Sequence, residues 1–185
     1  GKIDIGLIKF LFPLSFIGSA FGVIAVQQIP SQFLKPLVVV MLLAVTVYTF
    51  TRKEWGDTST YQGMTKKTAY LSGLAAFSIG FYDGFFGPGA GSFFIFAFLM
   101  IGFDFVVAAG NSKALNFASN IAAVITFIYF GSVNYYYAIP MGLSMIIGAL
   151  AGSHLAIKKG AAYVRPLFLF MSVVFISKQL LDVLH

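Results

Sequence analysis

Two polar motifs interrupt the long apolar stretches of this 185-residue chain, and their residue types fit the binding of a small anion. The first is the glycine-rich segment GPGAGS at residues 87–92, which Asp83 precedes. Glycine and proline end a helix there. A helix that restarts near Ser92 directs free backbone N–H groups and its positive dipole end into the break. Glycine lets the backbone approach a ligand closely, so we expect an anion site at Gly87, Gly89, Gly91 and Ser92.

The second motif, GNSKALNFASN at residues 110–120, places a lysine within another apolar stretch. Lys113, Asn116 and Asn120 have the spacing i, i+3 and i+7, so they share one face of a helix. A lysine near the middle of a membrane span costs about 3 kcal/mol on insertion scales, so it must face a partner or a cavity. One positive charge with amide donors beside it fits an anion. Asp83 is then a counter-charge for Lys113, a proton-coupling group, or a simple helix-end residue.

Both motifs also have a purely structural interpretation. Gly87 and Gly91 have the GxxxG spacing of a close helix crossing, although Pro88 argues against a continuous helix. Lys113 would in that case extend toward the membrane surface, and the asparagines beside it would join neighbouring helices.

The composition is that of an integral membrane protein. Hydrophobic residues make up 59% of the chain and charged residues 10%, with a mean hydropathy of +0.90, whereas a soluble domain averages about 25% charged residues. The net charge of +6 lies mostly in short gaps between apolar runs, where it indicates membrane topology and not nucleic-acid binding. The absence of cysteine excludes disulfides and zinc-thiolate sites. No metal-ligand spacing or protease-type aspartate pair occurs, so we expect neither an enzyme nor a cofactor.

Several apolar runs are long enough to cross a bilayer, which takes about 20 residues. This predicts an all-α integral membrane protein, a polytopic helical bundle that contains one glycine-broken helix. The expected spans are 6–26, 32–51, 69–103 with its break, 106–130, 137–157 and 164–181.

A shift of 130 residues reveals an internal repeat. It aligns Gly18 with Gly148 and Gly22 with Gly152, and the segment Lys35-Pro36-Leu37 with Arg165-Pro166-Leu167, without a gap. We therefore expect residues 1–65 to be the back half of a first repeat, with two transmembrane helices and a cytoplasmic loop. Residues 66–185 would be a complete second repeat, with a broken helix hairpin and three transmembrane helices. The front half of the first repeat is expected to be missing from the chain.

The basic residues predict how the two repeats are oriented. Basic clusters lie near the start of the chain, at 52–67 and at 158–159, whereas the gaps at 27–31 and 131–134 have none. The positive-inside rule places the three basic clusters in the cytoplasm. An odd number of crossings must then separate residues 67 and 131. A re-entrant hairpin at the glycine break followed by one full span satisfies this count and makes the repeats inverted.

The segments GFYDGFFGPGAGSF, NSKALNFASN and GALAGSHLAIKKG…VRPLF together resemble the second half of the sulfite exporter TauE/SafE family, also called the 4-toluene sulfonate uptake permease family. Within it, the chain resembles the YfcA-type branch of probable bacterial membrane transporters. The resemblance runs from residue 1 to residue 185, except that the family opens with another glycine-rich break that does not occur here. On this chain the second-repeat motif falls on Asp83, Gly87, Gly89, Gly91, Ser92, Lys113, Asn116 and Asn120.

The resemblance implies a multi-pass protein of about eight helices in the bacterial cytoplasmic membrane. It also implies a secondary transporter of sulfite, thiosulfate or organosulfonates, with proton coupling if Asp83 titrates during transport. The expected partners are a small anion, the lipid bilayer and the missing repeat half, but not nucleic acid; a homo-oligomer is left open. Two rival functions also stay open: an uncoupled anion channel, and a membrane scaffold or assembly protein whose polar stripe binds another helix.

Overall fold

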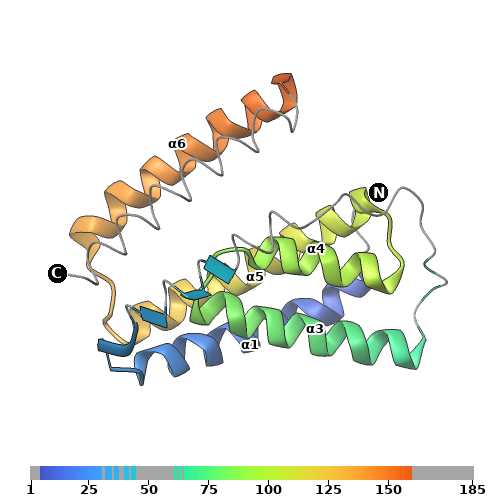
Figure 1. Ribbon diagram of the computed structural model, residues 1–185, viewed down its shortest axis with the longest axis horizontal. Coiled ribbons are helices and arrows are strands. Elements are labelled where there is room, and N and C mark those ends of the chain that lie inside the picture. The colour runs from blue at the N-terminus through green and yellow to red at the C-terminus, as the bar shows by residue number, and fades with distance from the viewer. Residues whose placement is uncertain are drawn as a thin grey trace. The chain divides into compact units, whose positions relative to one another are not determined.

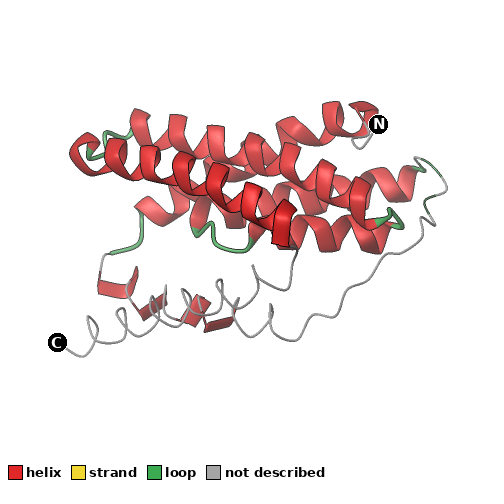
Figure 2. Ribbon diagram, turned by 90° about the horizontal axis from the view of Figure 1, so that it is seen from above, coloured by secondary structure: helices red, strands yellow, loops and turns green. Residues whose placement is uncertain are grey.

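The computed structural model describes residues 5–30 and 65–159, together with residues 61 and 63 and scattered positions between 32 and 44. The side chains of 153 and 155–159 are outside this description. All regular structure in the described part of the chain is helical (Figures 1 and 2). The helices are α1 (Ile5–Gln27), α3 (Lys66–Phe85), α4 (Ala90–Ile101), α5 (Phe105–Tyr129) and α6 (Tyr135–Lys159).

The chain divides into two compact units. The first contains α1, α3, α4 and α5, and the second contains residues 32–50 and the chain from residue 131 onward, including α6. The expected spans at 6–26, 106–130 and 137–157 are confirmed as helices, and the expected broken span at 69–103 is present as α3 and α4. The span at 164–181 and most of the span at 32–51 lie outside the described residues.

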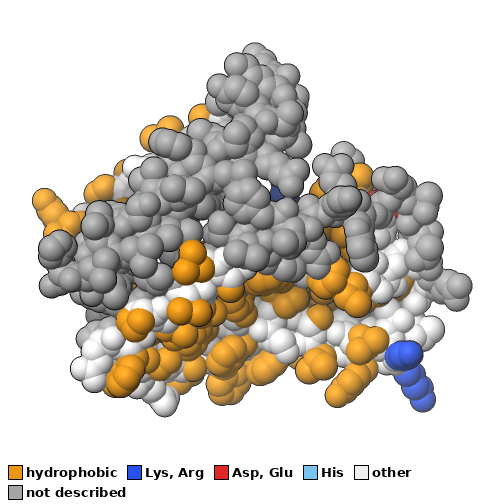
Figure 3. Space-filling model, viewed as in Figure 1, with side chains coloured by type: hydrophobic (Ala, Val, Ile, Leu, Met, Phe, Trp, Pro, Cys, Tyr) orange, Lys and Arg blue, Asp and Glu red, His pale blue; other side chains and the backbone are white. Residues whose placement is uncertain are grey.

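Two of the described helices are long and apolar enough to cross a membrane by length and composition. They are Ile5–Gln27, with a mean hydropathy of 1.9, and Tyr135–Gly152, with a mean hydropathy of 1.3. Figure 3 shows hydrophobic side chains spread over the described surface. Large exposed apolar residues occur on every described helix. A surface of this kind is stable against lipid and not against water.

Helices α1 and α5 run in the same direction and are joined by two serine hydroxyls of α1. Ser15 Oγ donates to the carbonyl oxygen of Leu115 at 3.0 Å, and Ser19 Oγ donates to that of Ser119 at 2.6 Å. The residue numbers rise together along both helices, so the helices are parallel. Both serines are fully buried. Serine is common in such membrane-helix contacts because it is small and its hydroxyl can bond across the interface.

Helix α3 also runs parallel to α1, in backbone-to-backbone contact. A β-carbon built on Gly80 would lie 2.9 Å from Ser15 Cα, and one built on Gly84 would lie 2.8 Å from Ser19 Cα. Real β-carbons do not approach other atoms this closely, so only glycine fits at these two positions. On the α1 side, the glycines that meet the α3 backbone in the same way are Gly18 and Gly22.

Helix α4 folds back along α3. Near the break, the ring of Tyr82 lies 5.1 Å from that of Phe93. At the other end, the last residues of α4 and the first residues of α3 line one groove. Helix α4 has 12 residues, about 18 Å at 1.5 Å per residue, which is shorter than the roughly 30 Å of a bilayer core.

The hairpin of α3 and α4 turns well before the ends of its neighbours. Gly84 at the end of α3 lies against Ser19, and α1 continues beyond this level to Gln27. Ser119 lies at the same level of α5, which continues to Tyr129. The break therefore lies inside the bundle, beside the middle of two longer helices. A small apolar core packs at the other end of this unit, formed by Leu7, Leu11, Ala76, Phe94, Phe98, Phe103, Ala108 and Leu115.

Candidate functional site

The predicted helix break is present and depends on two glycines in the left-handed conformation. Helix α3 ends at Phe85, Gly87 has φ +91°, and Gly89 has φ +87° at the N-cap of α4. Residues with a β-carbon are strained at such angles. The second helix begins at Ala90, two residues before the expected start at Ser92. The break is therefore a defined turn between two helices.

Three of the backbone N–H groups at the break donate hydrogen bonds within the turn. Ala90 N donates to the carbonyl oxygen of Gly87 at 3.2 Å, while Ser92 N and Phe93 N donate to that of Gly89 at 2.9 and 3.1 Å. Within the described structure, no acceptor is recorded for the N–H groups of Gly89 and Gly91. Two donors therefore stay available at the positive end of α4, which is the arrangement that favours an anion.

The surroundings of Gly87 and Gly91 do not have the geometry of a close helix crossing. Among the described residues, a β-carbon built on Gly91 meets no atom within 4 Å, and one built on Gly87 meets only atoms of Asp83, at 3.5 and 3.9 Å. No described residue therefore packs against the Cα of Gly91. The close crossing of this unit is formed elsewhere, by the glycines of α1 and α3.

Asp83 joins the last turn of α3 to the middle of α5. Its Oδ2 atom accepts a hydrogen bond from Asn116 Nδ2 at 3.1 Å and a second, short one from Ser119 Oγ. Ser119 Oγ also contacts the carbonyl oxygen of Asn116 at 3.0 Å. The carboxyl group is partly buried, so these donors stand in for the water that it loses.

Ser112 attaches the break itself to α5. Its hydroxyl donates to the carbonyl oxygen of Gly91 at 2.8 Å. Lys113 follows directly along α5, with an exposed side chain. The structure thus brings the two polar motifs of the sequence together through hydrogen bonds between α5 and the end of the hairpin.

The three residues expected on one face of α5 differ in their surroundings. Asn116 is partly buried and turned toward α3, whereas Lys113 and Asn120 are exposed. Asn120 Nδ2 donates to the backbone and side-chain oxygens of Asn116 at 2.6 and 3.2 Å. Among the described residues, Lys113 forms no ion pair with Asp83, whose recorded partners are Asn116 and Ser119. Ser92 is exposed at the first turn of α4.

Sequence reasoning did not select three residues that organise this site, Tyr82, Ser15 and Ser19. Tyr82 donates its hydroxyl to the carbonyl oxygen of Pro88 at 2.6 Å and so fixes the turn. The hydroxyls of Ser15 and Ser19 join α1 to α5. The second of these bonds ends on the carbonyl oxygen of Ser119, whose own hydroxyl bonds to Asp83. The signal for the α1 residues was present, because small residues recur every four positions along α1 and α3, as expected for close helix contacts. These are Ser15, Gly18, Ser19 and Gly22 on α1, and Ser72, Ala76, Gly80 and Gly84 on α3.

No site with the donor set of a metal centre occurs in the part of the chain that the structure describes. No three histidine, cysteine, aspartate or glutamate side chains gather there. The polar groups at the break are amides, hydroxyls, one carboxylate and one ammonium group. This set can bind a small anion and can hold or release a proton at Asp83.

Comparisons with known proteins agree with the resemblance seen in the motifs. The family described as "Sulfite exporter TauE/SafE" matches residues 1–178. "Probable membrane transporter protein ORF9" of Sinorhizobium sp is 34% identical over 173 residues, which cover 93% of this chain and 66% of that protein. "Probable membrane transporter protein YfcA" of Escherichia coli K12 is 32% identical over 175 residues, which cover 94% of this chain and 64% of that protein.

A third relative, "Probable membrane transporter protein" of Haemophilus influenzae, is 32% identical over 176 residues, with 95% of this chain and 68% of the relative covered. The chain thus spans about two thirds of the length of these relatives. No solved structure matches it significantly.

Proposed function

The chain belongs to the sulfite exporter TauE/SafE family, and on this basis we propose that it is part of a secondary transporter for small sulfur-containing anions. Sulfite, thiosulfate and organosulfonates are the proposed substrates. The names of the relatives describe membrane transporters and none names an enzyme, which supports the transport activity. Because those relatives are longer than this chain, the activity is proposed for the protein that contains the whole bundle.

The anion binds beside the break, between the start of α4 and the polar face of α5. Lys113 supplies the positive charge, and the N–H groups of Gly89 and Gly91 supply backbone donors. Asn116 and Asn120 add amide donors. Gly87 shapes the turn, and Ser92 presents its hydroxyl at the first turn of α4. Two observations support this placement. The two glycine N–H groups have no recorded acceptor in the described structure, and no described atom lies within 4 Å of a β-carbon built on Gly91.

The single observation that carries the mechanism is the hydrogen bond from Asn116 to Asp83. An ionised Asp83 holds the donors of Asn116 and Ser119 and adds a negative charge beside the anion site. Protonation removes this charge and releases the donors for the substrate. Anion and proton therefore bind together, and each raises the affinity for the other by the same factor.

A re-entrant hairpin fits the geometry of the first unit. Helices α1, α3 and α5 start at one end of this unit, and α4 returns to the same end. Lys9, Lys66 and Lys67 lie near that end, whereas the segment 131–134 after α5 has no basic residue. By the positive-inside rule, the shared end faces the cytoplasm of a bacterial cell. The hairpin enters and leaves there. We place α1 and α5 across the membrane, although α5, with its polar residues at 111–120, is less apolar than α1.

The repeat gains support from the glycines of α6. Under the 130-residue shift, the start of α1 at Ile5 corresponds to the start of α6 at Tyr135. Among the described residues, Gly148 and Gly152 of α6, the equivalents of the α1 glycines that meet α3, have no neighbour within 4 Å. We therefore place residues 1–65 in the back half of a first repeat and 66–185 in the second, and α6 receives the broken helix of the first repeat. Alternating access then moves one repeat against the other.

Thermal unfolding of the purified protein in detergent tests the anion site. Sulfite, thiosulfate, taurine, sulfate and chloride are titrated separately against the wild type and Lys113→Gln. A ligand that binds only the folded state raises the melting temperature with the logarithm of its concentration over Kd. We expect a sulfur-containing anion to stabilise the wild type, and at least tenfold more of it to be needed for the variant.

Lys9→Gln is the matched control, because it removes an exposed lysine of α1 outside the site. It should keep the wild-type response to the anion. If the anion stabilises all three proteins equally, Lys113 is not part of the site. If no anion stabilises the wild type, either in this chain or in a longer protein that includes the first repeat, anion transport by this fold is refuted.

The exposure of Lys113 and Asn120 favours one other function, a scaffold whose polar stripe binds another membrane helix. In that case Lys113→Gln would abolish co-purification with the partner and leave the response to anions unchanged. An uncoupled anion channel is a further alternative. It would give anion flux that does not depend on a proton gradient.

A further inference from the structure

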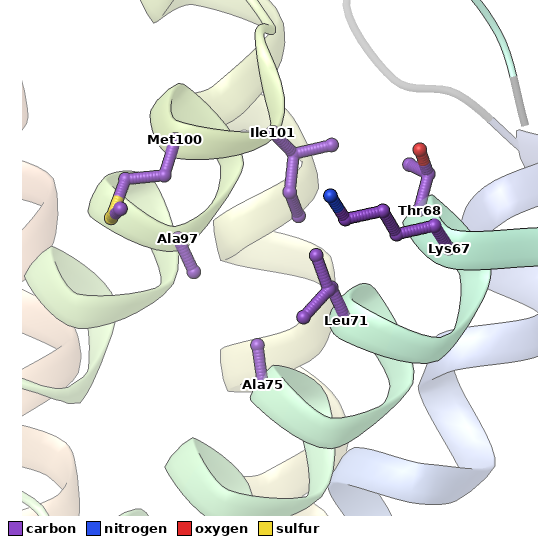
Figure 4. Close-up of a pocket in the computed structure, with 7 residues that line it drawn as sticks. All are labelled: Lys67, Thr68, Leu71, Ala75, Ala97, Met100 and Ile101. Carbon is purple, nitrogen blue, oxygen red and sulfur yellow. The ribbon is translucent and has the colours of Figure 1, made fainter. Parts of the chain in front are cut away.

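A groove lies between the start of α3 and the end of α4, at the end of the hairpin opposite the break (Figure 4). Its volume is about 420 Å³. The walls are apolar except at one end, where Lys67 extends its ammonium group over the groove toward Ile101 (Figure 4). The lining residues are Lys67, Thr68, Leu71, Ala75, Ala97, Met100 and Ile101.

The apolar part of the groove is open to the side. Leu71 is 46% exposed and Met100 is 72% exposed. On a helical hairpin in a bilayer, such an opening faces lipid chains. The two alanines of the groove, Ala75 and Ala97, leave room for a chain to lie between the helices. The groove is therefore shaped for an apolar chain that enters from the bilayer.

The positive charge at the mouth of the groove favours an anion there. Lys66 and Lys67 occupy the first turn of α3, which contains no acidic residue. Two positive charges at the positive end of a helix dipole are unfavourable. A negative group bound at Lys67 removes this repulsion.

We propose that the groove binds an anionic phospholipid of the bilayer, with its phosphate at Lys67 and an acyl chain along Leu71, Ala75 and Ala97. Basic pockets between membrane helices on the cytoplasmic side recognise such headgroups. A soluble phosphate would use the lysine but not the apolar walls. The groove shares no residue with the proposed anion site at the break, so a failure of the transport proposal would not refute lipid binding.

Thermal unfolding in detergent with three added probes tests this site. The probes are phosphatidylglycerol, phosphatidylcholine with the same acyl chains, and inorganic phosphate. We expect phosphatidylglycerol to stabilise the protein most, and phosphate alone to have no effect at the same concentration. Lys67→Gln should weaken the response to phosphatidylglycerol about fivefold, the contribution of one basic residue near an anionic membrane surface.

Two further variants separate charge from shape. Lys9→Gln removes another exposed lysine and should keep the wild-type response to lipid. Ala97→Leu fills the groove without changing charge and should weaken binding of phosphatidylglycerol more than Lys67→Gln does. Equal responses to both phospholipids, unchanged binding by Lys67→Gln, or full competition by inorganic phosphate would overturn the proposal. Loss of all lipid binding in a longer protein that includes the first repeat would also overturn the proposal. It would indicate that a helix of that repeat occupies the groove.

Discussion

Asn116 Nδ2 donates a hydrogen bond to Asp83 Oδ2 across 3.1 Å, between the middle of α5 and the last turn of α3. Two residues that were selected from separate sequence motifs thus meet at one point. In this contact, the amide donor of Asn116 is used by the carboxylate of Asp83. A substrate anion would need the same kind of donor, so we propose that the charge state of Asp83 decides whether Asn116 is available.

The re-entrant hairpin predicts where single cysteines react with a membrane-impermeant maleimide. The chain has no cysteine, so each substitution introduces the only thiol. Thr65→Cys before α3 and Phe105→Cys at the start of α5 should both react from the cytoplasmic side, because α4 returns to the end where α3 begins. Ser132→Cys after α5 should react from the opposite side. Labelling in intact cells and in inside-out vesicles distinguishes the two sides.

Opposite sides for Thr65→Cys and Phe105→Cys would rule out a re-entrant hairpin. The same result would show that α3 and α4 together cross the membrane. Lys9→Cys in α1 is the control, and it should label from the same side as Thr65→Cys.

Gly84→Ala is expected to destabilise the protein strongly. An added β-carbon would overlap the backbone of Ser19, with the Cα at 2.8 Å, and backbone cannot move aside as a side chain can. We expect a loss of about 1–3 kcal/mol, which is typical of overpacking, and a lower melting temperature. Gly91→Ala is the matched control, because a β-carbon at Gly91 meets no described atom within 4 Å. Equal melting temperatures for the two variants would contradict the close packing of α1 and α3.

Ser112→Ala should weaken anion binding with little change in stability. The variant loses the hydrogen bond to the carbonyl oxygen of Gly91, which holds the break against α5. Cross-helix hydrogen bonds in membrane proteins average about 0.6 kcal/mol, so the melting temperature should shift by a few degrees at most. The measurement is the anion titration of the melting temperature. Ser144→Ala is the control, because the hydroxyl of Ser144 bonds within α6, and this variant should bind the anion as the wild type does. The same anion affinity in both variants would refute the role of Ser112.

The helices and the break could be predicted from the sequence because they depend on local properties. An apolar run of about 20 residues is sufficient to indicate a span, and Gly87, Pro88 and Gly89 are sufficient to end a helix. The register of α1, α3 and α5, and the residues at their contacts, were not predicted. They depend on which small residues of one helix meet the backbone of another, as Gly84 meets Ser19, and the average hydropathy of each helix carries no information about this choice.

The site was predicted only in part, because the sequence of one helix does not show which of its residues a neighbouring helix covers. Helical spacing places Lys113, Asn116 and Asn120 on one face, but it does not say which of them a neighbouring helix covers. The sequence therefore suggested Lys113 as one candidate counter-charge for Asp83, whereas the structure gives Asp83 the donors of Asn116 and Ser119. The roles of Lys113 and Asp83 in anion binding stay predictions.

Proton uptake on anion binding tests the central claim most directly. Titration calorimetry in buffers of different ionisation enthalpy measures how many protons are taken up when the stabilising sulfur anion binds. We predict uptake of up to one proton per anion in the wild type and none in Asp83→Asn, which should bind the anion at neutral pH because its side chain is always uncharged. Asp104→Asn, at the N-cap of α5 where asparagine also caps well, should behave as the wild type. The same proton uptake in the wild type and in Asp83→Asn, or loss of anion binding in Asp83→Asn while the protein stays folded, would contradict the account.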